Sequence, residues 1–407
     1  MAVLREILSN RNLGLMAATV GLVHLALHIY QPWWSLYLME LGASIELVGL
    51  LEVLRRSLVL ACQLPGGLLT DRLGRKKMIL FGTSLRSLTF LIFMLAQTWQ
   101  HLILGLITYD LAMLGSPAVT LLALESLHPK RRAAGMSVVT MMNLLAATTA
   151  MPLSGFVMDA YGIVNGMRLI LATDAILFLT VLIARLKLRE TLVPRKTERV
   201  RLGLKEVASS FRLERGELAL LLTETLIMAG MSTSRAYLVV YGTKVIGLTR
   251  TQWGLLEMAL YLSWAALSLP GGMFADRFGR RPAILIAMIG FPLTILNYVL
   301  LRDFGAILVA NVVAGSLLGL GGGRPPQGSA AWQALIADMV PTERMGRVLG
   351  VLRTVSGLIT TPFPYIGGYL WVALRPDAAM LTSVALMSTA MLPFYTLVKP
   401  TRERRSA

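Results

Sequence analysis

Charged residues are scarce in this sequence. They make up 15% of the 407 residues, whereas a soluble domain carries about 25%. So few charges leave too little polar surface to cover a water-soluble globule of this length. Cysteine is almost absent too, because Cys62 is the only one and it lies in an apolar run. A single thiol excludes a framework of intramolecular disulfides, so we expect Cys62 to be a small core residue.

Two familiar sequence signals are also missing. No Gly-x-x-x-x-Gly-Lys-Ser/Thr phosphate loop occurs, so we expect no nucleotide and no other cofactor. Residues 1–11 are mixed in charge and run directly into a long apolar stretch. They lack the short apolar core and small-residue cleavage site of a signal peptide, so we expect the first apolar helix to be retained.

Long apolar runs dominate what is present, and 55% of the residues are hydrophobic. A run of about 20 apolar residues spans a hydrocarbon core of about 30 Å. Such a run must be helical, because lipid offers backbone polar groups no other partner. The sequence therefore predicts an all-α membrane protein with twelve spans. The expected spans are 12–38, 46–70, 78–99, 101–126, 134–160, 165–186, 216–243, 251–275, 282–301, 304–338, 346–372 and 377–398.

The tenth expected span, 304–338, is too long for one straight helix. It contains three successive glycines, Gly321 to Gly323, followed by Pro325 and Pro326. Glycine loosens a helix, and proline removes a backbone hydrogen bond. We expect a kink or a break at this point.

Basic residues are distributed unevenly about these spans. Of the 39 Lys and Arg residues, 27 lie in segments on one side, five on the other and seven within helices. This asymmetry places both termini and the segment 187–215 in the cytoplasm. It explains the net charge of +17 without a nucleic acid partner. Residues 203–215 are predicted to form an amphipathic helix on the inner membrane surface.

The decisive feature is an internal repeat. Residues 49–80 align without gaps on residues 254–285, at an offset of 205 and with 15 of 32 positions identical. A weaker match pairs Pro152 and Gly155 with Pro364 and Gly367. Duplicated halves are a known transporter architecture. The expected organisation is an N-terminal six-helix bundle (1–187), a cytoplasmic linker (188–215) and a C-terminal six-helix bundle (216–407).

Both copies of the repeat contain the same loop pattern, which runs Gly, three residues, Asp, Arg, any residue, Gly and two basic residues. This pattern resembles the loop signature of the major facilitator superfamily. The resemblance implies twelve spans in two pseudo-symmetric bundles, alternating access, and a latch on the inner face that stabilises the outward-open state. The residues that match are Gly67, Asp71, Arg72, Gly74, Arg75, Gly272, Asp276, Arg277, Gly279 and Arg280.

The loop pattern also has a physical interpretation of its own. Gly67 and Gly272 would let a neighbouring helix approach closely. Asp71 lies at a helix C-terminus, where the helix dipole disfavours an anion, so it needs a compensating positive group. Gly74 and Gly279 would allow the tight turn. The alternative is that these charges only fix the topology.

Two features depart from the antiporters of that family. Met151 and Phe156 stand where the proline–glycine motif of helix 5 would have glycine. Tyr109 and Asp110 stand in helix 4, where drug antiporters often carry an arginine. These departures count against proton/drug antiport.

Ionisable residues within spans are costly and are therefore functional candidates. The resemblance places helices 1, 4, 7 and 10 around a central cavity. Burial favours the protonated form of a carboxylic acid, so Asp110 is the preferred proton carrier, and a histidine can carry a proton near neutral pH. Two arginines would suit an anionic substrate or an internal carboxylate. The candidates are His24, His28, Asp110, Glu224, Arg235, Glu257 and Arg324.

Three weaker interpretations complete the set. Glu52 has arginines three and four residues later, so it is expected to be neutralised locally. The aromatic cluster Tyr30, Trp33, Trp34 and Tyr37 is interpreted as an interfacial belt. The histidines share a helix face, but no carboxylate or cysteine lies at ligand spacing beside them, so no metal site is expected.

The sequence thus predicts a secondary active transporter and not an enzyme. Proton-coupled efflux of a small amphipathic or drug-like molecule is the favoured function, and uptake of an organic anion or other nutrient is the alternative. The expected partners are a small-molecule substrate, a coupling proton and the lipid bilayer. The expected state is a monomer in a prokaryotic plasma membrane.

Overall fold

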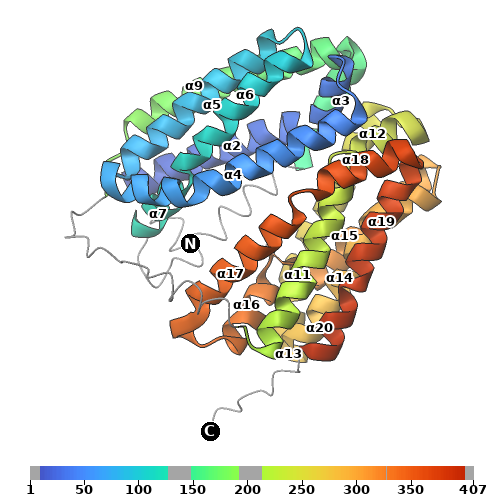
Figure 1. Cartoon of the computed structure of the whole chain (residues 1–407). Helices are drawn as coiled ribbons and strands as arrows, with labels where there is room; N and C mark the ends of the chain where they lie inside the picture. The colour runs from blue at the N-terminus through green and yellow to red at the C-terminus, as the bar shows by residue number, and fades with distance from the viewer. Residues whose placement is uncertain (1–9, 127–147, 192–212, 327, 399–407) are drawn as a thin grey trace. The chain divides into compact units, whose positions relative to one another are not determined.

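The structure is a computed structural model that describes residues 10–126, 148–191, 213–326 and 328–398 (Figure 1). These residues are helical almost throughout, which confirms the predicted all-α class. The chain divides into two compact units. Unit 1 comprises Met1–Lys196 and Thr249–Met258, and unit 2 comprises Thr197–Leu248 and Ala259–Ala407. Most of the predicted amphipathic helix at 203–215 lies outside the described residues.

Unit 1 is built from long helical segments that are joined by short turns, and some segments consist of several consecutive elements. Its first helix begins at an Asn10 cap, whose side chain accepts hydrogen bonds from the backbone of Asn12 and Leu13, as helix N-termini require. The elements are α2 (Arg11–Tyr30), η1 (Gln31–Trp33), α3 (Trp34–Glu40), α4 (Ile45–Leu73), α5 (Arg75–Leu95), α6 (Trp99–Leu111), η2 (Ala112–Gly115), α7 (Ser116–Ser126), a helix over 148–161 and α9 (Ile163–Leu186).

Unit 2 repeats this scheme with one addition, a two-stranded antiparallel hairpin. Helix α13 begins in residues that group with unit 1 and continues into unit 2. The elements are α11 (Arg215–Ser234), α12 (Leu238–Val240), η4 (Tyr241–Ile246), α13 (Arg250–Phe278), α14 (Arg280–Leu300), α15 (Phe304–Leu320), β1 (Gly323–Arg324), β2 (Gly328–Ser329), α16 (Ala330–Met339), α17 (Thr342–Thr360), α18 (Phe363–Ala373), α19 (Pro376–Thr389) and α20 (Met391–Leu397).

Seven helical segments among the described residues are long and apolar enough to cross a membrane, and α15 is a shorter apolar helix. Between 17% and 61% of each apolar window is buried. The remaining apolar side chains face outward, as a lipid solvent permits. The count of twelve spans stays a prediction, because residues 127–147 lie outside the described part of the chain.

Four of the expected spans depart from uniform α-helix at one point along their length. The predicted break in the tenth span is confirmed, because the hairpin β1–β2 separates α15 from α16. The sequence did not reveal the interruptions at η1, at η2 and between α11 and η4. By contrast, α4, α13 and α14 continue through Pro65, Pro270 and Pro292, so a proline alone does not mark a break in this protein.

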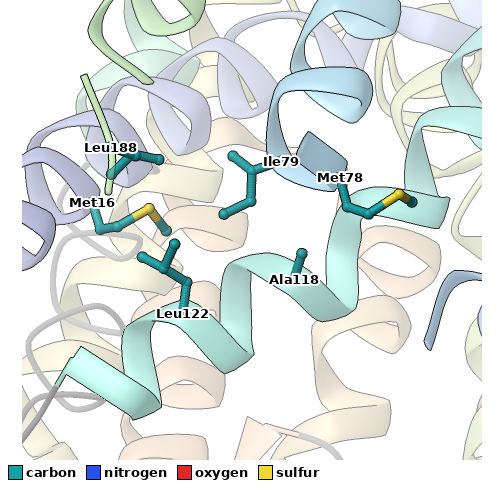
Figure 2. Close-up of a cluster of buried hydrophobic side chains, with 6 residues drawn as sticks. All are labelled: Met16, Met78, Ile79, Ala118, Leu122 and Leu188. Carbon is teal, nitrogen blue, oxygen red and sulfur yellow. The ribbon is translucent and has the colours of Figure 1, made fainter. Parts of the chain in front are cut away.

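A compact apolar cluster fills the space between helices at one end of unit 1 (Figure 2). Its members come from α2, α5, α7 and the chain just after α9, so it joins four segments that are distant in sequence. The buried residues are Met16, Met78, Ile79, Ala118, Leu122 and Leu188.

Glycines mark where helices approach most closely, but one position earlier than predicted. A Cβ atom at Gly66 would lie 2.8 Å from the carbonyl oxygen of Leu114. The repeat-related Gly271 faces the carbonyl oxygen of Gly319 in the same way, again at an offset of 205. No atom of the described residues lies within 4 Å of a Cβ placed at Gly67 or Gly272. The close-approach role of Gly67 and Gly272 stays a prediction, because the close contacts that the described residues show lie at the preceding helix position, about 100° away.

The aromatic cluster of the first span is also placed differently from the prediction. Trp33 and Tyr37 are fully buried in unit 1, and Tyr30 is nearly so. The Trp33 indole donates a hydrogen bond to Ser154 Oγ at 2.8 Å, and the Tyr37 hydroxyl donates to the Phe93 carbonyl at 3.0 Å. An interfacial belt needs exposed rings. These rings instead hold the first span against its neighbours.

Candidate functional site

The loop between α4 and α5 turns at Gly74, whose φ of +100° requires glycine. The Arg75 side chain folds back and is buried. It donates hydrogen bonds to Asp71 Oδ1 at 2.9 Å, to the Thr70 carbonyl at 3.0 Å and to Glu125 Oε1 at 3.1 Å. The positive group that Asp71 needs at this helix end is thus supplied by the same motif.

The same loop contains an acid that the sequence did not reveal. Glu190, just beyond α9, accepts hydrogen bonds from the backbone nitrogens of Arg75 at 2.9 Å and Lys76 at 3.1 Å. A carboxylate at a helix N-terminus satisfies unpaired donors and is favoured by the helix dipole. Glu190 therefore anchors the start of α5 to the chain that leaves α9.

The second copy of the loop, between α13 and α14, has the same design. Gly279 turns with φ +96°. Arg280 donates to the Ala334 carbonyl at 2.8 Å and pairs with Asp338 on α16. In each unit the motif arginine therefore reaches an acid near the end of the interrupted fourth helix of that unit. Asp276 and Arg277 are exposed, as is Arg72 in the first copy. The latch role of these motif residues stays a prediction.

The two proline–glycine segments lie at close helix contacts within their own units. A Cβ atom at Gly155 would lie 3.0 Å from Cα of Thr251, and one at Gly367 would lie 2.9 Å from the carbonyl carbon of Thr233. Pro152 is part of the first contact, because its Cα would lie 2.8 Å from a Cβ at Gly254. Pro364 accepts a hydrogen bond from the hydroxyl of Tyr237.

Unit 1 contains Asp110, which the sequence predicted as a proton carrier. Asp110 lies on α6 and is fully buried. Neither of its carboxyl oxygens has a hydrogen-bond partner among the described residues. Arg55, Glu52 and Arg86 lie within electrostatic range of it. Arg55 is itself held by Glu52, at 2.7 Å and 2.8 Å, which is the local neutralisation that the sequence predicted.

Arg86 links Asp110 to the two histidines. Its guanidinium lies 5.3 Å from the centre of the Tyr109 ring and within electrostatic range of His24. The His24 and His28 rings are stacked, with centroids 6.5 Å apart, as their spacing of four residues predicts. Arg86 was missed because it lies on the third span, outside the cavity helices. Its signal was a single charge in the apolar run 78–99.

Two further buried charges on α9 were missed for the same reason. Both carboxyl oxygens of Asp174 are buried without a hydrogen-bond partner among the described residues. Arg185, three turns later on the same face, donates to Thr83 Oγ1 at 2.8 Å and to Thr19 Oγ1 at 3.3 Å. Arg185 ties α9 to α2 and α5, so its role is structural.

In unit 2, Glu224 is buried on α11, accepts a hydrogen bond from Ser356 Oγ at 3.4 Å, and has Arg353 within electrostatic range. Arg235 is exposed at the end of α11. Glu257 is half-buried on α13, in the part that groups with unit 1. Within unit 2, Glu224 and Arg235 lie eleven residues apart along α11 and its C-terminal end, which is about 16 Å.

Arg324 lies on β1, in the hairpin that interrupts the tenth span. Its guanidinium carbon lies 5.3 Å from the ring centres of Tyr261 and Trp264 and 5.6 Å from that of Phe291. Trp332, on the following helix α16, is fully buried and its ring stacks on that of Phe394 with the centroids 5.8 Å apart, so it is a core residue.

Comparison with known proteins identifies the family. The model of the Major Facilitator Superfamily matches this chain over residues 16–323 and 220–407. The chain belongs to the major facilitator superfamily. Membership makes it a membrane transporter of small molecules and not an enzyme, as predicted.

Curated relatives of this superfamily member match over a limited part. The Quinolone resistance protein NorA of Staphylococcus aureus is 30% identical over 147 residues, which is 36% of this chain and 35% of NorA. The match therefore spans about a third of each protein.

Solved structures match over nearly the whole chain. The D-xylose-proton symporter has a TM-score of 0.69 and 16% identity, and covers 95% of this chain and 98% of its own. The nucleoside transporter NupG has a TM-score of 0.73 and 12% identity, and covers 96% of this chain and all of its own. Similarity at this level of identity establishes the superfamily fold.

Proposed function

We propose that this superfamily member is a secondary active transporter that couples proton movement to the export of a small amphipathic molecule. It works by alternating access as a monomer in a prokaryotic plasma membrane, with both termini in the cytoplasm. The single observation that carries the proton coupling is the environment of Asp110.

Asp110 combines two properties that a proton carrier needs. In the described structure its carboxyl oxygens have no hydrogen-bond donor, and an unpaired carboxylate in an apolar interior is strongly disfavoured. Protonation removes this cost. Arg55 and Arg86 lie within electrostatic range, so a small rearrangement gives the deprotonated form a positive partner. Proton binding and side-chain arrangement are thereby linked.

The loop motifs supply the conformational part of the proposal. Asp71 and Asp276, with their flanking glycines and arginines, act as latches on the inner face and stabilise the outward-open state. Arg75 and Arg280 hold each loop in shape through Glu125 and Asp338. The limited similarity to NorA, a quinolone resistance protein, supports a role in resistance to a toxic compound.

The test is flux in proteoliposomes with and without a pH gradient. Asp110→Asn removes the titratable proton at nearly constant volume, and we expect it to abolish the response of flux to the gradient. Asp174→Asn is the matched control, because Asp174 is also a buried carboxyl without a hydrogen-bond partner in the described structure but has no charged group within electrostatic range there. Flux that depends on the gradient equally in both variants would show that Asp110 does not carry the coupling proton.

Uptake of an organic anion is the second candidate, and the positive charge of Arg324 favours it. Two assays separate the candidates. Export predicts that expression protects growing cells against toxic amphipathic compounds and that everted vesicles accumulate them. Uptake predicts that right-side-out vesicles accumulate a labelled organic anion, without any growth protection.

A further inference from the structure

Unit 2 contains an arginine held among three aromatic rings, and all four residues belong to that unit. The Tyr261 and Trp264 rings lie one turn apart on α13 and are stacked, with centroids 5.8 Å apart and planes inclined by 27°. Phe291 approaches from α14. The Arg324 guanidinium lies 5.3 Å to 5.6 Å from all three ring centres.

The backbone fixes Arg324 in this position. Arg324 pairs with Gly328, and Gly323 pairs with Ser329, in the antiparallel hairpin. Gly322 and Gly323 have φ values of +78° and +107°, which favour glycine. The expected tenth span therefore stops being helical at the residues that deliver this side chain. A continuous helix satisfies its own backbone hydrogen bonds in a membrane, so replacing it by a hairpin costs free energy. The hairpin therefore indicates that the position of Arg324 is functionally important.

Arg324 has no counter-charge within the described structure. No Asp or Glu forms an ion pair with it among those residues, and its Nε is buried without an acceptor. The side chains of Arg324, Tyr261 and Trp264 are all half-buried, so the cluster is not sealed inside the core. The aromatic faces stabilise the cation but leave the edge of the guanidinium, where its N–H donors point, without an anion.

We propose that Arg324, Tyr261, Trp264 and Phe291 form a recognition site for aromatic carboxylates. The carboxylate accepts hydrogen bonds from the terminal nitrogens of Arg324, and the aromatic ring of the ligand packs against the stacked pair of Tyr261 and Trp264. This inference rests on the proposed function in that it assigns the class of molecule transported, and it is independent of the direction of transport.

The geometry favours an aromatic acid over an aromatic cation. Ring faces attract cations, but here they already face the guanidinium, and a second cation would meet an unneutralised positive charge. A planar guanidinium matches a carboxylate through two parallel hydrogen bonds. Neighbouring rings add stacking with an aromatic ligand. An aliphatic acid can form the paired hydrogen bonds with the guanidinium but cannot stack on the rings, so it should bind more weakly than an aromatic acid.

The experiment measures equilibrium binding of 2-naphthoate to the full-length purified protein in detergent, without any gradient. Three other probes accompany it, which are the neutral 2-naphthamide, the cation 2-naphthylmethylamine and the aliphatic cyclohexanecarboxylate. We expect 2-naphthoate to bind most tightly. Arg324→Gln should weaken its binding at least tenfold and leave that of 2-naphthamide unchanged. Trp264→Leu should weaken 2-naphthoate several-fold more than cyclohexanecarboxylate.

Arg302→Gln is the matched control. Arg302 also lies over an aromatic ring in unit 2, 5.8 Å from the centre of Tyr241, and donates to the Tyr298 carbonyl. The Arg302→Gln variant should bind 2-naphthoate as tightly as the wild-type protein does. If Arg324→Gln fails to fold, Arg324→Lys decides, because it keeps the charge but loses the paired donors and should still weaken binding several-fold.

Three results would overturn the site. They are equal loss in Arg324→Gln and Arg302→Gln, tighter binding of the naphthyl amine, and no binding of 2-naphthoate to a folded wild-type protein. Because binding is measured without flux, its outcome is separate from proton coupling. Binding of 2-naphthoate with flux indifferent to a pH gradient would leave this site standing and reject the proposed coupling.

Discussion

The carboxylate of Glu190 occupies the space that a side chain at residue 74 would need. A Cβ atom at Gly74 would lie 2.5 Å from Glu190 Oε2, and Gly74 has φ +100°. Gly74→Ala therefore adds backbone strain and displaces the cap of α5. We expect it to lower the free energy of unfolding by about 1–3 kcal/mol, measured by denaturant titration in detergent.

Gly279→Ala separates the two causes. Its φ is +96°, but the nearest atom to an added Cβ is Pro282 Cδ at 3.8 Å. Only the backbone strain remains, so Gly279→Ala should lower the free energy of unfolding by less than Gly74→Ala does. Equal losses would mean that Glu190 adds nothing to the requirement for glycine.

Helix packing predicts opposite outcomes at neighbouring glycines. Gly66→Ala places a methyl group 2.8 Å from the Leu114 carbonyl oxygen, within a helix contact. Overpacking of this kind costs about 1–3 kcal/mol. Gly67→Ala meets no described atom within 4 Å and should be neutral or slightly stabilising. Thermal unfolding of the purified variants, followed by fluorescence, would compare them, and a larger loss at Gly67 would refute the assigned contact.

The inner loop depends on Arg75 more than on its neighbour. Arg75→Ala removes hydrogen bonds to Asp71, Glu125 and the Thr70 carbonyl. Because both acids are partly exposed and can reach water, we expect a moderate loss of about 1–3 kcal/mol. Arg72 is exposed, so Arg72→Ala should change stability by less than about 0.5 kcal/mol. Denaturant unfolding of both variants under identical conditions is the measurement.

The aromatic residues of the first span should matter for stability and not for substrate. Trp33→Phe loses the hydrogen bond from the indole to Ser154 Oγ, at 2.8 Å, which is worth about 0.5–1.5 kcal/mol. Ser154→Ala should cost a similar amount and the double variant should be less than additive. Substrate affinity measured on the folded variants should be unchanged. A loss of affinity at full stability would instead place Trp33 in the cavity.

The internal repeat predicted the architecture because the same helix contacts recur in both units. The gap-free offset of 205 in the sequence reappears in space, where Gly66 faces Leu114 and Gly271 faces Gly319. The positive φ at Gly74 and Gly279 was equally predictable, since few other residues tolerate that turn. Local spacing also predicted the contacts of Glu52 and the shared helix face of His24 and His28, whose rings are stacked in the structure.

Contacts between residues that are distant in the chain could not be predicted from the sequence. Nothing near Gly74 indicates that Glu190, more than a hundred residues later, caps the adjoining helix. The buried charges Arg86 and Asp174 are visible in the sequence as ionisable residues in apolar runs, but they lie on the third and sixth spans, outside the helices that the family resemblance places around the cavity. The choice between Gly66 and Gly67 depends on helix rotation, because one residue turns the chain by about 100°.

The four interruptions in the first, fourth, seventh and tenth spans have a mechanical consequence. A continuous rod such as α13, with 29 residues, bends only by straining its ladder of hydrogen bonds. Within the described residues of the four spans, the ladder tightens to 3-10 turns at η1 and η2, widens to a π turn at η4 and is cut only at the β1–β2 hairpin. Irregular turns of this kind are where helices bend. These four spans are therefore expected to bend more readily than a uniform helix such as α13.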